Sequence, residues 1–223
     1  MTRTRIKICG LTREQDVDAC VKAGLDAVGF VLYAPSARAV TAERAATLAK
    51  RLPAFVTPVL LFVNASAEEI SHACAQVPGA WLQFHGDETP EACQHIADAQ
   101  GRRWMRAARI PLETPAGQHP FDLLKYAHDY QNAHALLLDA HVEGYGGGGK
   151  TFNWSQLPQN VNAHLVLSGG LNAANVTEGL SALRGRGLSL AVDVSSGVES
   201  AKGIKDADKI HAFVNAVRLA DAG

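Results

Sequence analysis

The feature that most constrains the fold is a regular alternation of short apolar runs with amphipathic stretches. Eight apolar runs predict strands over residues 5–9, 27–32, 57–63, 80–84, 103–108, 135–139, 164–168 and 188–193. Apolar runs separated by stretches of helical periodicity are typical of parallel strands with crossover helices. The spacing is about 28 residues per unit, which suits eight βα units better than a doubly wound sheet with a switch point. We therefore predict an α/β fold, a (β/α)8 barrel of the TIM type, as a single domain over residues 1–223.

Helices are predicted between these strands from periodicity and from residues that favour helix ends. They cover 13–24, 41–51, a stretch that opens at residue 66, 89–99, 121–130, 172–183 and 206–220. Thr12 is a candidate N-cap for the first of them, and Ser66 with Glu69 forms a capping box.

Composition narrows the class of protein. The formal net charge is −1, so no basic field indicates binding to nucleic acid or to a membrane surface. No apolar run approaches the ~18 residues of a membrane span, and the first residues lack the apolar core of a signal peptide. Cys20, Cys74 and Cys93 fall in predicted helices without metal-ligand spacing, and we expect buried, reduced thiols there. A cytoplasmic location is the expectation.

In a barrel of this type, chemistry gathers where the strands end. The residues found there are Cys9, Arg38, Gln83, His85, Asp139, Gly169, Gly170, Asp193, Ser195, Ser196 and Gly197. This set is rich in groups that titrate, donate hydrogen bonds or allow tight turns.

Two Gly/Ser turns follow the last two strands. Gly169-Gly170 and Ser195-Ser196-Gly197 would present backbone N–H groups at the start of a helix, where negative charge is favoured. Two ordinary tight turns are the alternative. Because barrels recurrently bind phosphate at this place, the sequence favours a phosphorylated substrate.

A glycine-rich loop follows the sixth strand. Residues 144–151 formally fit the GxxxxGK[ST] pattern of a nucleotide P-loop. A P-loop must run directly into a helix, however, and Thr151 is followed by poor helix formers and Pro158. We therefore interpret the loop as a lid whose Lys150 approaches the substrate.

Cys9 and Asp139 are the candidate acid/base pair, because they end strands on different sides of one cavity. A core thiol and a loop-bracing aspartate are the alternatives. A thiol is a poor base until it is ionised, so Cys9 needs a positive charge or N–H groups nearby. Lys7 shares a face with Cys9 only if the strand stays regular, so the spacing alone does not identify that charge. Asp139 would need an apolar or like-charged setting to keep its proton near neutral pH.

Taken together, these segments resemble the phosphoribosylanthranilate isomerase family of tryptophan biosynthesis. The resemblance covers every strand except the fifth. It rests on residues 7–11 (KICGL), 29–30 with 36–38, 62–64, 82–87, 138–139 with 146–151, 167–171 and 192–199 (VDVSSGVE).

The resemblance implies an Amadori rearrangement with no metal or organic cofactor. It places Cys9 on the general base and Asp139 on the general acid, and it places Arg38 opposite the anthranilate carboxylate. The phosphate cradle falls on Gly169, Gly170, Ser195, Ser196 and Gly197, and we expect Asp193, Gln83, His85 and Lys150 to support the site.

Three other functions remain open from the sequence. Another sugar-phosphate barrel, such as a pentose-phosphate epimerase or the histidine-pathway isomerase, is the nearest. An epimerase would require a His/Asp metal set at the strand ends, where only His85 stands beside Asp139 and Asp193. The others are an inactive protein that binds a phosphorylated ligand, and a nucleotide-hydrolysing P-loop protein.

Overall fold

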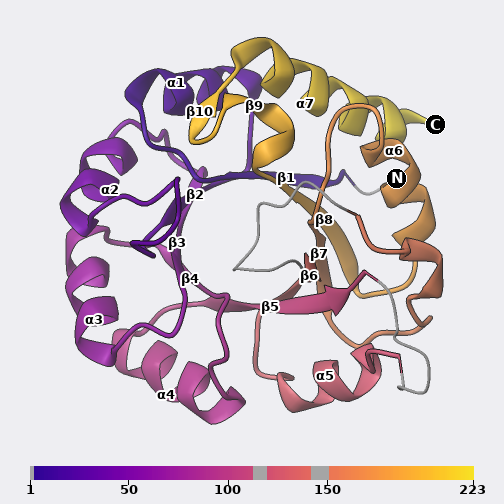
Figure 1. The fold of residues 1–223 in the computed structure, drawn as a ribbon, viewed down its shortest axis with the longest axis horizontal. Helices are drawn as coiled ribbons and strands as arrows, with labels where there is room; N and C mark the ends of the chain where they lie inside the picture. The colour runs from indigo at the N-terminus through magenta and orange to yellow at the C-terminus, as the bar shows by residue number, and fades with distance from the viewer. Residues whose placement is uncertain (1–2, 113–119, 142–150) are drawn as a thin grey trace.

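The chain forms a closed barrel of eight parallel strands, which confirms the predicted α/β architecture (Figure 1). The structure is a computed structural model that describes residues 3–112, 120–141 and 151–223. Each strand pairs with the next, and the eighth pairs with the first. The strands are β1 Arg5–Cys9, β2 Ala27–Val31, β3 Thr57–Phe62, β4 Trp81–Phe84, β5 Trp104–Pro111, β6 Ala135–His141, β7 His164–Leu167 and β8 Ser189–Val194.

Helices surround the barrel as an outer ring (Figure 1). They are α1 Glu14–Ala23, α2 Ala42–Ala49, α3 Ala67–Gln76, α4 Pro90–Gln100, α5 Leu123–Asp129, α6 Val176–Leu183 and α7 Ala207–Ala222. Within the described residues, no helix is long and apolar enough to cross a membrane. Cys20, Cys74 and Cys93 are buried, free thiols in α1, α3 and α4, as predicted.

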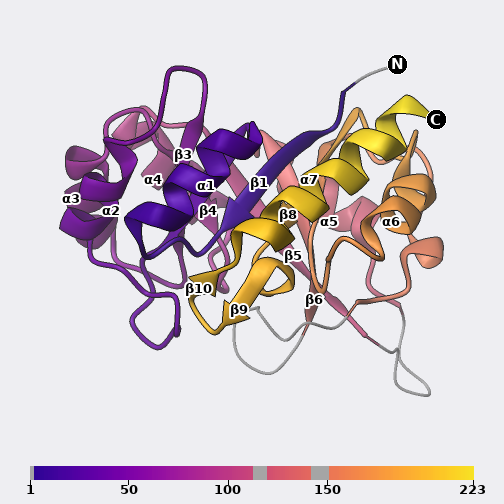
Figure 2. The same ribbon diagram turned by 90° about the horizontal axis from the view of Figure 1, so that it is seen from above.

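An antiparallel hairpin between β8 and α7 was not predicted. Its strands are β9 Glu199–Ala201 and β10 Ile204–Lys205, and the short 3-10 helix η2, Ser196–Val198, precedes it. Figure 2 shows the hairpin at the end of the barrel where β8 finishes. The hairpin is too short and too polar to carry a clear strand pattern in the sequence.

Capping residues explain most of the helix starts. Ser66 and Glu69 form the predicted capping box, and Thr41 accepts a hydrogen bond from the Arg44 backbone. The prediction for Thr12 is wrong, because Arg13 occupies the N-cap position of α1 and no side chain caps that helix. The Thr12 hydroxyl instead donates to the carbonyl of Gly203, in the hairpin turn.

The alternation of side chains along β1 decides what faces the barrel interior. Ile6 and Ile8 are buried in the layer between strands and helices. Successive side chains of a strand point to opposite faces, so Lys7 and Cys9 point into the barrel. A register shift of one residue would exchange the two sets, and burial of both isoleucines opposes that shift. Hydrophobic packing outside the barrel therefore fixes the polar groups inside it.

An ion pair on β5 supports the loop that follows β4. Arg106 donates to a carboxylate oxygen of Glu88 at 2.7 Å and to the carbonyl of Gly86 at 2.9 Å. Glu88 accepts in turn from the backbone N–H groups of Asn64 and Gly86, at 2.8 and 2.9 Å. The side chains of Arg106 and Glu88 are only 6% and 7% exposed. The pair thus holds the loop that carries His85.

We expect Arg106→Met to lower the free energy of unfolding by about 3–5 kcal/mol, because it leaves the Glu88 carboxylate buried without its partner. Urea denaturation measures the loss. Arg103→Met is the matched control, since Arg103 is exposed and lies 5.6 Å from the Trp81 ring centre. That control should lose about 1 kcal/mol or less. Equal losses in the two variants would contradict the role given to Arg106.

Candidate active site

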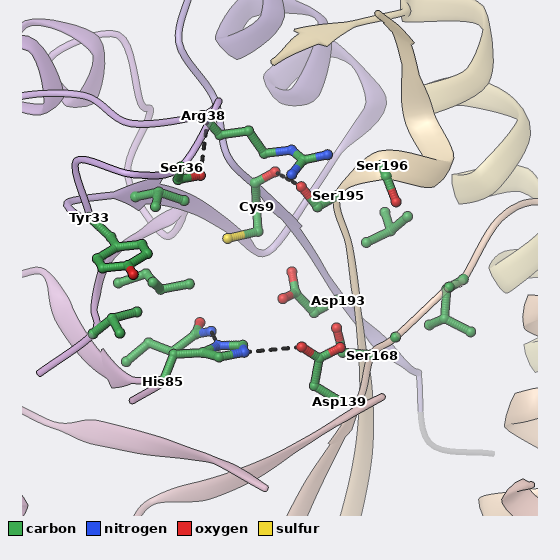
Figure 3. A pocket seen from close by; sticks show the side chains of 18 residues that line it. Cys9, Tyr33, Ser36, Arg38, His85, Asp139, Ser168, Asp193, Ser195 and Ser196 are labelled. Carbon is green, nitrogen blue, oxygen red and sulfur yellow. Dashed lines mark hydrogen bonds and ion pairs between the residues drawn. The ribbon is translucent and has the colours of Figure 1, made fainter. Parts of the chain in front are cut away.

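A pocket with an empty volume of about 690 Å³, its open mouth included, lies at the carboxyl ends of the strands (Figure 3). Of the predicted site residues, those that line it are Cys9, Arg38, Gln83, His85, Asp139, Gly169, Gly170, Asp193, Ser195 and Ser196. Gly197 lies beside the pocket in η2, and Lys150 lies outside the described residues. The pocket therefore collects groups from strands that are far apart in the sequence.

Cys9 lies at the end of β1 beside an apolar wall. It packs with Val31, Leu61 and Val63, and Tyr33 lies against the same cluster. This wall was not predicted, because Val31, Leu61 and Val63 belong to apolar runs that are typical of any buried strand. Burial raises the pKa of the Cys9 thiol, and the positive charges of Lys7 and Lys205 only partly oppose this effect.

Lys7 and Asp193 form an ion pair directly below Cys9. Their charged atoms lie 2.9 Å apart, and each side chain is 5% exposed. Burial alone would lower the pKa of Lys7, but the negative charges of Asp193 and Cys9 outweigh burial and raise it. Because β1 is regular, Lys7 is on the same face as Cys9, which is the condition that the sequence left open.

Asp139 faces the pocket from a different side than Cys9 does (Figure 3). Its Oδ2 lies 3.0 Å from Nε2 of His85, and Nδ1 of His85 lies 2.9 Å from the side-chain amide of Gln83. All three side chains are buried. With the Gln83 amide nitrogen toward the ring, Nδ1 of His85 accepts and Nε2 donates to Asp139. These contacts fix the orientation of the Asp139 carboxyl group.

Arg38 reaches the pocket from the loop after β2. Its Nε and Nη2 atoms donate to the two carboxylate oxygens of Glu199 at 2.7 and 2.8 Å. The family resemblance places Arg38 opposite the anthranilate carboxylate, and its contact with Glu199 was not predicted. This bidentate geometry is the strong form of an arginine–carboxylate contact.

Glu199 also binds Lys205 of the hairpin. The Lys205 ammonium lies 2.8 Å from Glu199 Oε1 and donates to the carbonyl of Ser195 at 3.0 Å. The hydroxyl of Ser195 donates to the carbonyl of Cys9 at 2.9 Å. Burial raises the pKa of Glu199, but hydrogen bonds from Arg38 and Lys205 outweigh it and lower that pKa. Through Ser195, these hydrogen bonds connect the hairpin to the end of β1.

The two Gly/Ser turns meet at one edge of the pocket. Gly169 and Gly170 have φ angles of 77° and 66°, a conformation that favours glycine. A Cβ atom at Gly197 would lie 1.9 Å from the carbonyl oxygen of Leu171, so the two turns touch only because residue 197 lacks a side chain.

The predicted helix start at residue 172 is wrong, because α6 begins at Val176. The Asn175 side chain accepts from the backbone N–H of Asn172 at 2.8 Å, and Asn172 accepts from that of Ala174 at 2.8 Å. Such side-chain bonds to nearby backbone compete with helix formation. The predicted phosphate-binding residues therefore lie in a loop and around η2, rather than in the first turn of α6.

The described part of the β6–β7 connection contains only the 3-10 helix η1, Trp154–Gln156. A nucleotide P-loop would place a long helix directly after Thr151. The described residues after Thr151 do not form one, in agreement with the sequence interpretation. The remainder of the glycine-rich loop lies outside the described residues.

Comparisons with known proteins place this chain in a family. The family model described as N-(5'phosphoribosyl)anthranilate (PRA) isomerase matches residues 6–216. The N-(5'-phosphoribosyl)anthranilate isomerase of Methylibium petroleiphilum is 63% identical over 220 residues, which cover 99% of this chain and 96% of the relative.

Solved structures agree with the sequence comparison. The crystal structure of phosphoribosyl anthranilate isomerase from Thermotoga maritima is 36% identical with a TM-score of 0.82, covering 97% of this chain and 99% of its own. A crystal structure of phosphoribosyl anthranilate isomerase in complex with reduced 1-(o-carboxyphenylamino)-1-deoxyribulose 5-phosphate is 33% identical with a TM-score of 0.79 and the same coverage. The chain therefore belongs to the N-(5'-phosphoribosyl)anthranilate isomerase family.

Proposed function

We propose that residues 1–223 form one catalytic domain that isomerises N-(5-phosphoribosyl)anthranilate to 1-(2-carboxyphenylamino)-1-deoxyribulose 5-phosphate, the third step of tryptophan synthesis from chorismate. Family membership supports the reaction. The observation that carries the proposal is the placement of Cys9 and Asp139 on different sides of one pocket that also holds an arginine and two Gly/Ser turns.

The reaction moves one proton to the sugar and removes another. Asp139 acts as the general acid and protonates the ring oxygen, so that the furanose opens to a Schiff base. Cys9 acts as the general base and removes the proton from C2, which gives an enolamine that rearranges to the aminoketone. The contacts of Asp139 with His85 and of His85 with Gln83 support the acid by holding its carboxyl group toward the pocket.

The substrate is elongated, with one anionic group at each end. The turns at Gly169–Gly170 and Ser195–Gly197 form the phosphate site, because glycine and serine backbones can bring N–H groups close to an anion. The anthranilate ring lies against the apolar wall of Val31, Leu61 and Val63. The complex of a relative with reduced 1-(o-carboxyphenylamino)-1-deoxyribulose 5-phosphate supports a ligand that carries these two anionic groups.

Arg38 faces the anthranilate carboxylate in this arrangement. Since its Nε and Nη2 atoms are held by Glu199, the Nη1 side of the guanidinium is the part assigned to the substrate. Glu199 then fixes the arginine in place before the substrate arrives, which reduces the entropy lost on binding.

We expect Cys9→Ser and Asp139→Asn each to lower kcat by about 100-fold or more, because each removes one proton-transfer group. Binding of the reduced product analogue should persist, since neither change removes the phosphate turns or Arg38. A coupled assay for turnover and calorimetry for binding measure the two effects. Substantial turnover in either variant would remove that residue from its proposed role.

We expect Arg38→Ala to raise KM by about tenfold or more, because a hydrogen bond to a charged group contributes about 1.5–3 kcal/mol. Steady-state kinetics measures the change. Arg44→Ala is the matched control, since Arg44 pairs with Glu14 on the outer helices and does not line the pocket. An unchanged KM in Arg38→Ala would contradict the assignment of the carboxylate.

Growth of a tryptophan auxotroph blocked only at this step tests the function as a whole. The gene for this chain should restore growth, and the Cys9→Ser variant should not. Failure of the unaltered chain, with soluble protein that still binds the product analogue, would favour the alternative of an inactive binding protein.

A further inference from the structure

A buried ammonium group lies beneath the floor of the pocket. Lys7 does not line the active-site pocket but a separate hollow at the opposite end of the barrel, while Asp193 lines the pocket itself. Lys7 is 4% exposed, and lysine is rarely buried to this extent without a partner or a role. Lys7 therefore contacts the floor of the pocket from below and does not contact the substrate.

The geometry of β1 and its neighbours places the Lys7 ammonium beside the sulfur of Cys9. In the strand register, Lys7 is opposite Asp193 and Cys9 is opposite Gly29. A Cβ atom built on Gly29 would lie 2.6 Å from Cys9 Sγ and 3.1 Å from Lys7 Nζ. The sulfur and the ammonium therefore both adjoin the space above Gly29, which exists because residue 29 has no side chain.

The ammonium contacts Asp193 at 2.9 Å, yet among the described residues it has no partner with full hydrogen-bond geometry. Oδ1 of Asp193 likewise lacks one. A purely structural ion pair at this depth is expected to have its remaining donors and acceptors satisfied. A donor left over beside a thiol is instead suited to a sulfur that becomes negatively charged.

We propose that Lys7 is a positioning residue that stabilises Cys9 as a thiolate, and that Asp193 keeps Lys7 charged while limiting this stabilisation. This proposal depends on the proposed function in one respect, namely that Cys9 is the base. Lys7 supplies the positive charge that such a base requires.

Two other cations, Lys205 and Arg38, interact with Cys9, but each differs from Lys7 in having other partners. Lys205 of β10 lowers the pKa of Cys9, but its ammonium is already engaged by Glu199 and Ser195. The guanidinium of Arg38 interacts with Cys9 as well, and its fork is engaged by Glu199. Among these cations, Lys7 has the largest influence on the pKa of the thiol.

Two substitutions at Lys7 separate this role from a structural one. Lys7→Met removes a positive charge and should raise the pKa of Cys9, because the Lys7 ammonium favours ionisation of the thiol. Lys7→Arg keeps the charge and should leave that pKa closer to its value in the unaltered protein. If the pair only held the strands together, both variants would lose stability without this difference in the pKa of Cys9.

The test is the pH dependence of Cys9 alkylation by iodoacetamide in the full-length protein, followed by mass spectrometry of the Cys9 peptide. For Lys7→Met, the inflection should move up by about one pH unit or more, with about tenfold slower alkylation below it. Lys7→Arg, which keeps the charge, should stay closer to the unaltered protein than Lys7→Met does.

Kinetics gives a second readout. Because Lys7 does not line the pocket, Lys7→Met should lower kcat and leave KM within about twofold. An unchanged alkylation profile in Lys7→Met, or an equal shift in Lys7→Met and Lys7→Arg, would overturn the proposal. If Lys7→Met does not fold, Lys7→Gln takes its place, and an unchanged inflection in that variant overturns the proposal.

Alkylation requires no substrate, so it reports on Lys7 even if the isomerase activity fails its own test. Cys9→Ser identifies the signal, because Cys20, Cys74 and Cys93 are buried and do not line the pocket.

Discussion

The closure of the barrel between β1 and β8 is the constraint on which the site depends. In the closed register Lys7 pairs with Asp193, so a lysine and an aspartate on neighbouring strands both point into the barrel. The same alternation that buries Ile6 and Ile8 against the helices directs Lys7 and Cys9 inward. The hydrophobic layer thus supplies the free energy that keeps an ion pair and a thiol in the interior.

Buried ion pairs seldom add much stability, because the desolvation of two charges offsets their attraction. The charges in this barrel are gathered around the pocket, as Lys7–Asp193 under Cys9 and as Arg38, Glu199 and Lys205 beside it. Such a concentration is expected at sites that must stabilise particular charge states. The Arg106–Glu88 pair differs, since it supports a loop and lies behind the pocket wall.

The barrel and most of its site could be predicted because strand ends in this fold converge, whatever their distance in sequence. Cys9, Asp139 and the two glycine turns each end a recognisable apolar strand. The place of Lys7 in the site was harder to predict, because its contact with Cys9 depends on the regularity of a five-residue strand. Glu199 and Lys205 belong to a hairpin with no clear pattern, and that hairpin also removes Thr12 from its expected capping role. Long-range pairing of short polar segments is set by tertiary contacts, which local periodicity does not record.

The hairpin that prediction missed connects the two ends of the proposed substrate site. Through Glu199 it holds Arg38, and through Lys205 it holds the carbonyl of Ser195 at the proposed phosphate turn. Because Glu199 and Lys205 also bind each other at 2.8 Å, the two proposed anion sites are linked by one buried network. The distance between a carboxylate and a phosphate held there is then set by the protein before binding. A rigid spacing of this kind discriminates by length, and it favours an elongated substrate with one anion at each end over a sugar phosphate that has only one.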